Sequence, residues 1–255
     1  MYPPPAGPEP GYPGTTPRYV QVRIPRVTPV VTYVMLGITI AVFLLQLATQ
    51  FIFGQDLVAA LGLKVNELII GGEFWRLITP MFLHASIIHI GFNMYALFAL
   101  GPSLESYYGH GRFLTLYLLA GFAGNVVSFL FSGNPSLGAS TAVFGLIGAE
   151  AIFLYRNRSI LGAMAQRALT NVIFIIVVNL LLGMSSSGID NWGHVGGLLG
   201  GTFYAWFAGP LFKVEGGYLD PKLVDERDQR SALIFGVLDF VIFAALAAMK
   251  ILRGY

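Results

Sequence analysis

The stretch NWGHVGGLLGG, residues 191–201, decides how the helices of this chain pack. Gly197 and Gly201 follow His194 by three and seven residues, so on a helix all three lie on one face. Small residues on one face let two membrane helices approach each other backbone to backbone. The stretch therefore predicts a helix with a close neighbour on the face that carries His194.

A second stretch, GASTAVFG at residues 138–145, supplies the matching face. It follows the turn signal SGNP at residues 132–135, and Gly145 lies in a stripe of small residues beside Ser140. We expect this helix to contact the helix of residues 191–210, with Ser140 and His194 at the same membrane depth. A serine beside an imidazole is an activated nucleophile.

The composition places the whole chain in lipid. Of its 255 residues 55% are apolar and 11% are charged, and the mean hydropathy is +0.69, which leaves too little polar surface for a soluble globule. The expected fold class is all-α, a polytopic transmembrane helix bundle with the lipid bilayer as its surroundings. Apolar runs of about the length that a span requires cover residues 29–53, 86–102, 112–131, 138–155, 168–184, 191–210 and 232–251.

The basic residues indicate the orientation of these helices. They occupy alternate loops, at Arg18, Arg23, Arg26, Arg112, Arg156, Arg158, Arg167, Lys213 and Lys222. The positive-inside rule then predicts a cytoplasmic N-terminus, with the ends that carry the three histidines of the spans facing outward. A prokaryotic plasma membrane is expected, because no organelle transit pattern precedes the first helix.

Four segments follow from this pattern. Residues 1–27, rich in proline, predict a disordered cytoplasmic tail. Residues 28–210 form the core of six transmembrane helices, in which residues 54–85 are an interfacial element too short to span. Residues 211–231 are expected to be a plain cytoplasmic linker, and residues 232–255 a seventh transmembrane helix.

Several classes of function are excluded or disfavoured. The chain has no cysteine, which excludes a thiolate nucleophile and a cysteine metal site. Its net charge of +2 offers no surface for nucleic acid. A metalloprotease would use His-Glu-x-x-His, and neither His84 nor His89 is followed by glutamate. A transporter would require charged residues within the spans and an inverted repeat, neither of which is evident.

The polar residues of the spans gather at one end. His84, His89 and His194 all map to the outer ends of helices, and Asn93 follows His89 by one turn. These residues could belong to a site, or could be interfacial side chains and interhelical hydrogen-bonding partners. Ser140 lies in a first turn, where free N–H groups suit an oxyanion, although a serine there can also be a simple helix cap.

Taken together, four motifs resemble the rhomboid protease family. They are Trp75-Arg76, His84-Ala85-Ser86-x-x-His89-x-x-x-Asn93, Gly138-x-Ser140 and His194-x-x-Gly197-x-x-x-Gly201. The resemblance covers residues 70–202 and implies a six-helix core, to which a C-terminal seventh helix is added in part of the family.

The resemblance implies an intramembrane serine endopeptidase that needs no cofactor or metal and cleaves transmembrane protein substrates. Ser140 would be the nucleophile and His194 the general base in a dyad, with His89 and Asn93 in the oxyanion hole. The resemblance gives supporting roles to His84, Gly138, Phe144, Trp75, Arg76 and Glu105. Among these, Phe144 can pack on the imidazole, and Trp75, Arg76 and Glu105 hold the first loop and its junction with the helices.

Two features depart from or complicate this pattern. Thr141 stands where the family usually has glycine, and we expect its side chain to lie near the scissile bond, where it would affect activity or substrate choice. It also keeps open a catalytically weak or inactive rhomboid-like protein that binds transmembrane segments. Asp190 is the only carboxylate near His194 in sequence, and a true triad is not expected.

Overall fold

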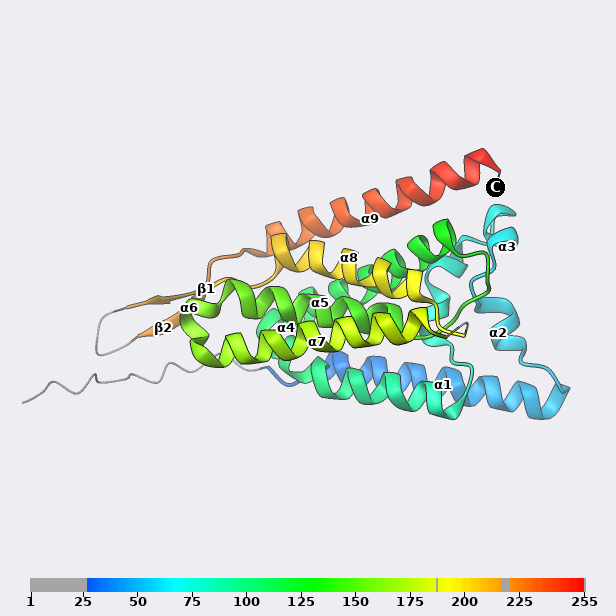
Figure 1. Ribbon diagram of the computed structural model, residues 1–255, viewed down its shortest axis with the longest axis horizontal. Coiled ribbons are helices and arrows are strands. Elements are labelled where there is room, and N and C mark those ends of the chain that lie inside the picture. The colour runs from blue at the N-terminus through cyan, green and yellow to red at the C-terminus, as the bar shows by residue number, and fades with distance from the viewer. Residues whose placement is uncertain (1–26, 187, 217–220, 255) are drawn as a thin grey trace, which may run out of the picture.

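The computed structural model describes residues 27–186, 188–216 and 221–254, and most of them lie in long helices (Figure 1). The predicted tail falls outside the described residues, except for its last residue, Val27. The helices and strands are α1 (Val30–Phe53), α2 (Leu57–Gly62), α3 (Asn66–Ile70), α4 (Ile87–Phe131), α5 (Ser140–Arg156), α6 (Arg158–Leu161), α7 (Ala163–Met184), α8 (Asn191–Ala208), β1 (Phe212–Glu215), β2 (Lys222–Asp225) and α9 (Gln229–Arg253), and two 3₁₀ turns cover Phe74–Leu77 and Thr79–Phe82.

Helix α4 is a hairpin of two helices. Gly109 has φ 75° and ψ 164° inside it, a conformation that glycine adopts without steric cost. Ser86 before α4 and Ser132 after it line the same cavity, so the two halves run antiparallel. The sequence predicted a loop at about residues 103–111, whereas helix continues on both sides of Gly109.

Four helices of the described chain are candidate spans. Helices α1, α4, α7 and α9 are long and apolar enough to cross a membrane, and the 45-residue α4 has two antiparallel halves. Helices α5 and α8 have 17 and 18 residues and lie between the others, with α9 along one side (Figure 1). The described residues thus form six core helices and a seventh, and the all-α prediction is confirmed. The segment between α1 and α4 contains only short helices and turns.

Glycines bring α5 and α8 together as predicted. A Cβ on Gly197 would overlap the carbonyl oxygen of Thr141, and a Cβ on Gly201 would overlap the backbone of Gly145. A Cβ on Gly145 would in turn overlap the side chain of Ala120 in α4. The three central helices therefore touch at backbone distance, which only small residues allow.

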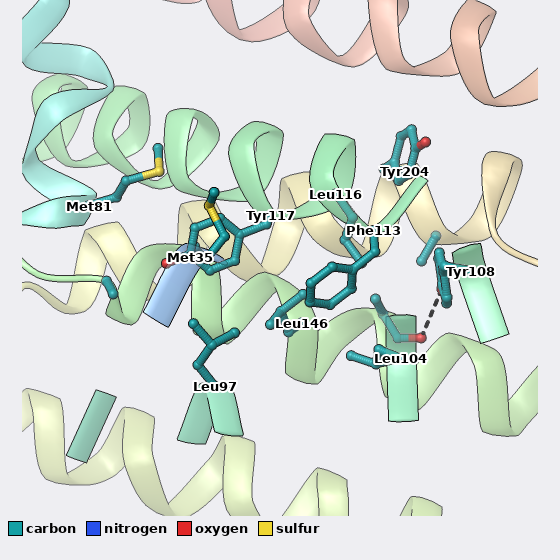
Figure 2. Packing of buried hydrophobic residues seen from close by; sticks show 14 of the residues in the cluster. Met35, Met81, Leu97, Leu104, Tyr108, Phe113, Leu116, Tyr117, Leu146 and Tyr204 are labelled. Atoms are coloured by element: carbon teal, nitrogen blue, oxygen red, sulfur yellow. Dashed lines mark hydrogen bonds between the residues drawn. The ribbon is translucent and has the colours of Figure 1, made fainter. Parts of the chain in front are cut away.

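The apolar core extends along these central helices. Figure 2 shows Phe113 and Leu116 of α4 near Leu146 of α5, and Tyr117 of α4 beside Met35 of α1. Toward the end of the core, Tyr108 donates a hydrogen bond to the carbonyl oxygen of Ala149 over 3.3 Å. This dense packing fixes α4 relative to α5, the helix that begins at Ser140.

A lysine joins the seventh helix to the core. Lys250 Nζ of α9 donates to the carbonyl oxygens of Phe129 and Leu130 over 2.6 and 3.2 Å. These carbonyl groups belong to the last turn of α4, where no N–H group of the helix is available to bond them. A cation at this position is therefore favourable. This contact explains why a basic residue lies at this end of an otherwise apolar helix.

The segment before α9 is more than a plain linker. Strands β1 and β2 pair antiparallel, with Phe212 opposite Asp225. Asp225 Oδ2 accepts from Arg112 of α4 over 2.5 Å, and Asn157 Oδ1 accepts from the N–H of Phe212 over 2.8 Å. The expectation of a plain linker did not include this strand pair or the contacts that join the segment to the bundle.

Candidate active site

A cavity of about 770 Å³ opens at the end of the bundle where α5 and α8 begin, called here the Ser140 end. Its walls come from α4, α5, α7, α8 and the loop before α5. Five of the residues selected from the sequence line it, namely Ser140, His194, His89, Asn93 and Phe144. The structure thus brings together side chains that lie as much as 105 positions apart in the sequence.

Ser140 is the first residue of α5. The N-cap is Ala139, which offers no side-chain cap, so Ser140 does not serve as the cap. Its N–H belongs to the first turn of the helix, where the N–H groups have no acceptor within the helix. Gly138 precedes it with φ +140°, and a Cβ there would overlap the His89 ring. Glycine is required at this position by both conformation and space.

His194 lies in the first turn of α8 and stacks on Phe144. The two ring centroids are 4.1 Å apart with an interplanar angle of 11°, and His194 is only 8% exposed. Within the described chain, no hydrogen bond joins Ser140 Oγ to His194, and His194 Nδ1 has no partner. Hydrogen bonds of this kind are often long in an empty site and shorten when substrate binds.

The stack makes a testable contribution. For the dyad that the resemblance implies, we expect Phe144→Leu to lower kcat by about 10-fold, because a flat aromatic contact is worth roughly 0.5–1.5 kcal/mol and leucine cannot hold the imidazole plane. Steady-state cleavage rates measure this effect, with Phe144→Tyr as the variant that keeps the ring. Equal rates for Phe144→Leu and wild type would show that the stack does not orient His194.

Asp190 does not face the imidazole. Its Oδ1 accepts from the N–H of Gly193 over 2.9 Å, and its Oδ2 accepts from Ser128 Oγ over 2.5 Å. Asp190 is the N-cap of α8. Both carboxylate oxygens are engaged elsewhere, which supports a dyad over a triad.

His89 is oriented as a donor. The N–H of Ala85 points at His89 Nδ1 over 3.4 Å, and this makes Nδ1 the acceptor and leaves the hydrogen on Nε2. Nε2 lies beside Gly138. Asn93 uses one amide hydrogen on the carbonyl oxygen of His89 over 2.9 Å, so its second amide hydrogen is free for a ligand.

The comparisons with known proteins agree with this arrangement. The model of the rhomboid domain matches residues 71–211. The chain belongs to the rhomboid family. It is thus an integral membrane protein, as its apolar helices also indicate.

Three relatives of this rhomboid illustrate the match. The chain is 44% identical over 178 residues to rhomboid protease GluP of Bacillus subtilis (strain 168), covering 69% of this chain and 34% of that protein. It is 35% identical over 156 residues to RHOMBOID-like protein 9, chloroplastic, of Arabidopsis thaliana, covering 61% and 36%. It is 34% identical over 187 residues to RHOMBOID-like protein 6, mitochondrial, of the same plant, covering 73% and 60%. The chain spans between about a third and three fifths of the length of these relatives.

His84 supports the loop before Ser140 in this rhomboid. Its Nε2 accepts from the N–H of Ala139 over 3.3 Å, and its backbone bonds Gln46 of α1 in both directions. Burial, with a smaller contribution from His89, lowers the pKa of His84 to about 3. The imidazole is therefore neutral at pH 7, as an acceptor must be.

Thr141 corrects an expectation. Its side chain is 4% exposed and lies against Gly124 of α4 and Gly193 of α8, away from the cavity. One residue along a helix turns a side chain by about 100°, so the residue after Ser140 faces the adjacent helices. Thr141 is a packing residue in this rhomboid, and its side chain does not line the cavity that holds Ser140.

Side-chain hydrogen bonds from Arg76 and Trp75 hold the first loop. Arg76 is buried, and its guanidinium donates to Glu73 and to the carbonyl oxygens of Leu63 and Ala60 over 2.7–2.9 Å. Trp75 Nε1 donates to the carbonyl oxygen of Leu61 over 3.0 Å. These bonds close the loop on itself between α1 and α4.

Glu105 has a different place from the one expected. It lies near the kink of α4, away from the first loop, and its carboxylate accepts from the N–H groups of Val31 and Thr32 over 2.9 and 2.8 Å. Helix α1 has no side-chain cap of its own, so Glu105 caps it from α4. The reason is that the antiparallel first half of α4 carries Glu105 to the opposite end of the bundle.

Three buried polar residues near the site were missed from the sequence. Gln46 and Ser128 lie inside apolar runs and read there as ordinary helix residues. Lys64 was not among the residues selected, although a lysine within the apolar stretch LVAALGLKVNELII is a signal for a buried, partnered cation.

Proposed function

We propose that this rhomboid is an intramembrane serine endopeptidase that cleaves transmembrane protein substrates through a dyad of Ser140 and His194. The observation that carries the proposal is the cavity at the Ser140 end. It holds a serine that caps nothing, an imidazole stacked on Phe144 and the His89 ring, contributed by three different helices. The name of the Bacillus relative as a rhomboid protease supports the same class of reaction.

In the proposed reaction, Ser140 Oγ attacks the carbonyl carbon of the scissile peptide bond. His194 accepts the hydroxyl proton and then donates it to the leaving amine, which breaks the C–N bond and leaves an acyl-enzyme. Water, deprotonated by His194, then hydrolyses the ester and restores Ser140. The chemistry uses no cofactor.

The oxyanion would be stabilised by donors already in place. The N–H of Ser140 belongs to the free first turn of α5, where the helix dipole favours negative charge. His89 Nε2–H lies beside Gly138, and the second amide hydrogen of Asn93 is available. These groups differ in origin, but all border the same cavity.

The walls of the cavity suit a transmembrane segment as substrate. Phe92 and Tyr95 of α4 and Ile175 of α7 line it, and the first two are also largely exposed at the lipid-facing surface. An apolar segment could therefore reach Ser140 from the bilayer. Its helix must unfold locally, because a helix hides its carbonyl oxygens, so substrates with helix-destabilising residues at the cleaved site are expected.

The orientation and segmentation of the chain are part of the proposal. The basic residues Arg112 and Arg156 lie at the end opposite Ser140, where they bond Asp225 and the carbonyl oxygen of Trp206. By the positive-inside rule that end is cytoplasmic, and the cavity opens on the other face. We assign residues 28–210 to the protease core and residues 232–255 to a seventh span.

The experiment is cleavage of a model transmembrane substrate by the purified protein in liposomes. A parallel sample contains a metal chelator, and another is first treated with a fluorophosphonate, a reagent that labels activated serines. We expect cleavage that the chelator does not affect, and a label that mass spectrometry assigns to Ser140.

Each alternative gives a different result. An inactive rhomboid-like protein would bind the substrate without cutting it and would take no label. A metalloprotease would lose activity with the chelator and retain it after fluorophosphonate treatment. Either result would overturn the proposal.

A further inference from the structure

Both carboxylate oxygens of Asp190 accept hydrogen bonds, although the proposed dyad does not use this residue. Oδ1 caps α8 through the N–H of Gly193, and Oδ2 accepts from Ser128 Oγ of α4 over 2.5 Å. The backbone oxygen of Asp190 accepts from the N–H of His194 over 3.1 Å. The turn of α8 that presents His194 is therefore fastened to α4.

Ser128 has a second neighbour on the other catalytic segment. It is fully buried, and its Oγ lies 3.4 Å from Ser136 Oγ. Ser136 belongs to the loop that leads into α5 and Ser140. One hydroxyl thus stands between the segment that carries His194 and the segment that carries Ser140.

A buried cation completes this junction. Lys64 is fully buried, and its Nζ donates to the carbonyl oxygens of Ser132 and Ser128 over 2.9 and 3.4 Å. Its backbone pairs with Ser136 in both directions. Burial lowers the pKa of Lys64 to about 8, while the nearby charge of Asp190 opposes the shift. At neutral pH Lys64 remains a cation that compensates the carboxylate and the end of α4.

The packing of α5 on α8 leaves a role for such a junction. These helices meet through Gly145, Gly197 and Gly201, positions that carry no side chain of their own. Side chains such as Thr141, which lies against Gly193, fill part of this contact. A directional hydrogen bond at the start of α8 adds a constraint on its depth and rotation.

We propose that Asp190 and Ser128 form a positioning pair, the Asp190–Ser128 clasp, that holds His194 at the depth and rotation at which it meets Ser140. The clasp rests on the proposed protease function. Neither residue touches the substrate, so both are positioning residues. A misplacement of about 1 Å can lower a rate by on the order of 100-fold, and the clasp lies one turn from His194.

The alternative is that Asp190 only stabilises α8 as a cap, and the chain contains a matched control. Asp228 is the N-cap of α9, where its Oδ1 accepts from the N–H and Oγ of Ser231. It has the same chemistry at the end of the bundle opposite Ser140. Asp228→Ala should therefore show the effect of losing a cap without losing the clasp.

The experiment measures kcat, KM and the thermal midpoint for wild type and four variants in detergent. We expect Asp190→Ala to lower kcat by about 10- to 100-fold with KM changed less than about 3-fold. Asp190→Asn should stay within about 3-fold of wild type, since its amide can accept from Gly193 and donate to Ser128 Oγ. Ser128→Ala, which keeps the cap, should lower kcat by about 10-fold, and Asp228→Ala should leave kcat unchanged.

Three results would overturn the clasp. The first is an Asp190→Ala variant with the kcat of wild type. If Asp190→Ala does not fold, the same result in Ser128→Ala counts instead. The second is an Asp190→Asn variant as inactive as Ser140→Ala, which would make the carboxylate a triad member. The third is a wild type that does not cleave, which overturns the proposed function together with the clasp, whereas the first two leave that function intact.

Discussion

Ser140→Ala is expected to abolish cleavage, with kcat lowered at least about 10³-fold. The hydroxyl is the only group in the proposed mechanism that forms a bond to the substrate, and alanine leaves the rest of the cavity in place. Because Ser140 caps nothing, its removal should not destabilise α5. The measurement is the rate of product formation in liposomes, together with the thermal midpoint.

A surface serine is the control for this variant. Ser159 is exposed in α6 at the opposite end of the bundle, and Ser159→Ala should cleave at the wild-type rate. Ser140→Ala should also keep the wild-type affinity for substrate, since binding depends on the apolar walls. Cleavage by Ser140→Ala within about 10-fold of wild type would rule out Ser140 as the nucleophile.

Gly197→Ala should have the largest effect on stability. A Cβ at this position would overlap the carbonyl oxygen of Thr141, which is backbone and cannot turn away. The helices α5 and α8 would have to separate, and overpacking of this kind costs about 1–3 kcal/mol or more. The separation would also move His194 from Ser140, so we expect kcat to fall at least about 10-fold and the thermal midpoint to fall with it.

The matched control is Gly37→Ala in α1. Gly37 is also inside a helix, but a Cβ there would have nothing within 4 Å. Alanine is a better helix former than glycine by about 1 kcal/mol, so this variant should be as stable as wild type or more so. If Gly197→Ala matched Gly37→Ala in both measurements, the backbone contact between α5 and α8 would not be what holds the site together.

The positions of the spans could be predicted from the sequence because lipid imposes a simple rule. An apolar run of about 20 residues must form a helix to satisfy its backbone, so the predicted boundaries differ from the observed ones mostly by a few residues. The glycine stripe around Gly197 and Gly201 predicted the contact between α5 and α8 for the same local reason. The strands before α9 were missed, because Phe212–Glu215 and Lys222–Asp225 are too short and too polar to stand out.

The sequence by itself determined the fold class, the helix contact and the gathering of His89, Asn93 and His194 at the Ser140 end, since each depends on the pattern within one segment. Only the tertiary structure decided where the neighbours of that set point. In the structure, the Thr141 side chain packs between helices, Glu105 lies at the end of the bundle opposite Ser140, and Asp190 is hydrogen-bonded to Ser128. These contacts depend on how helices rotate and cross in three dimensions, which a pattern along one helix does not fix.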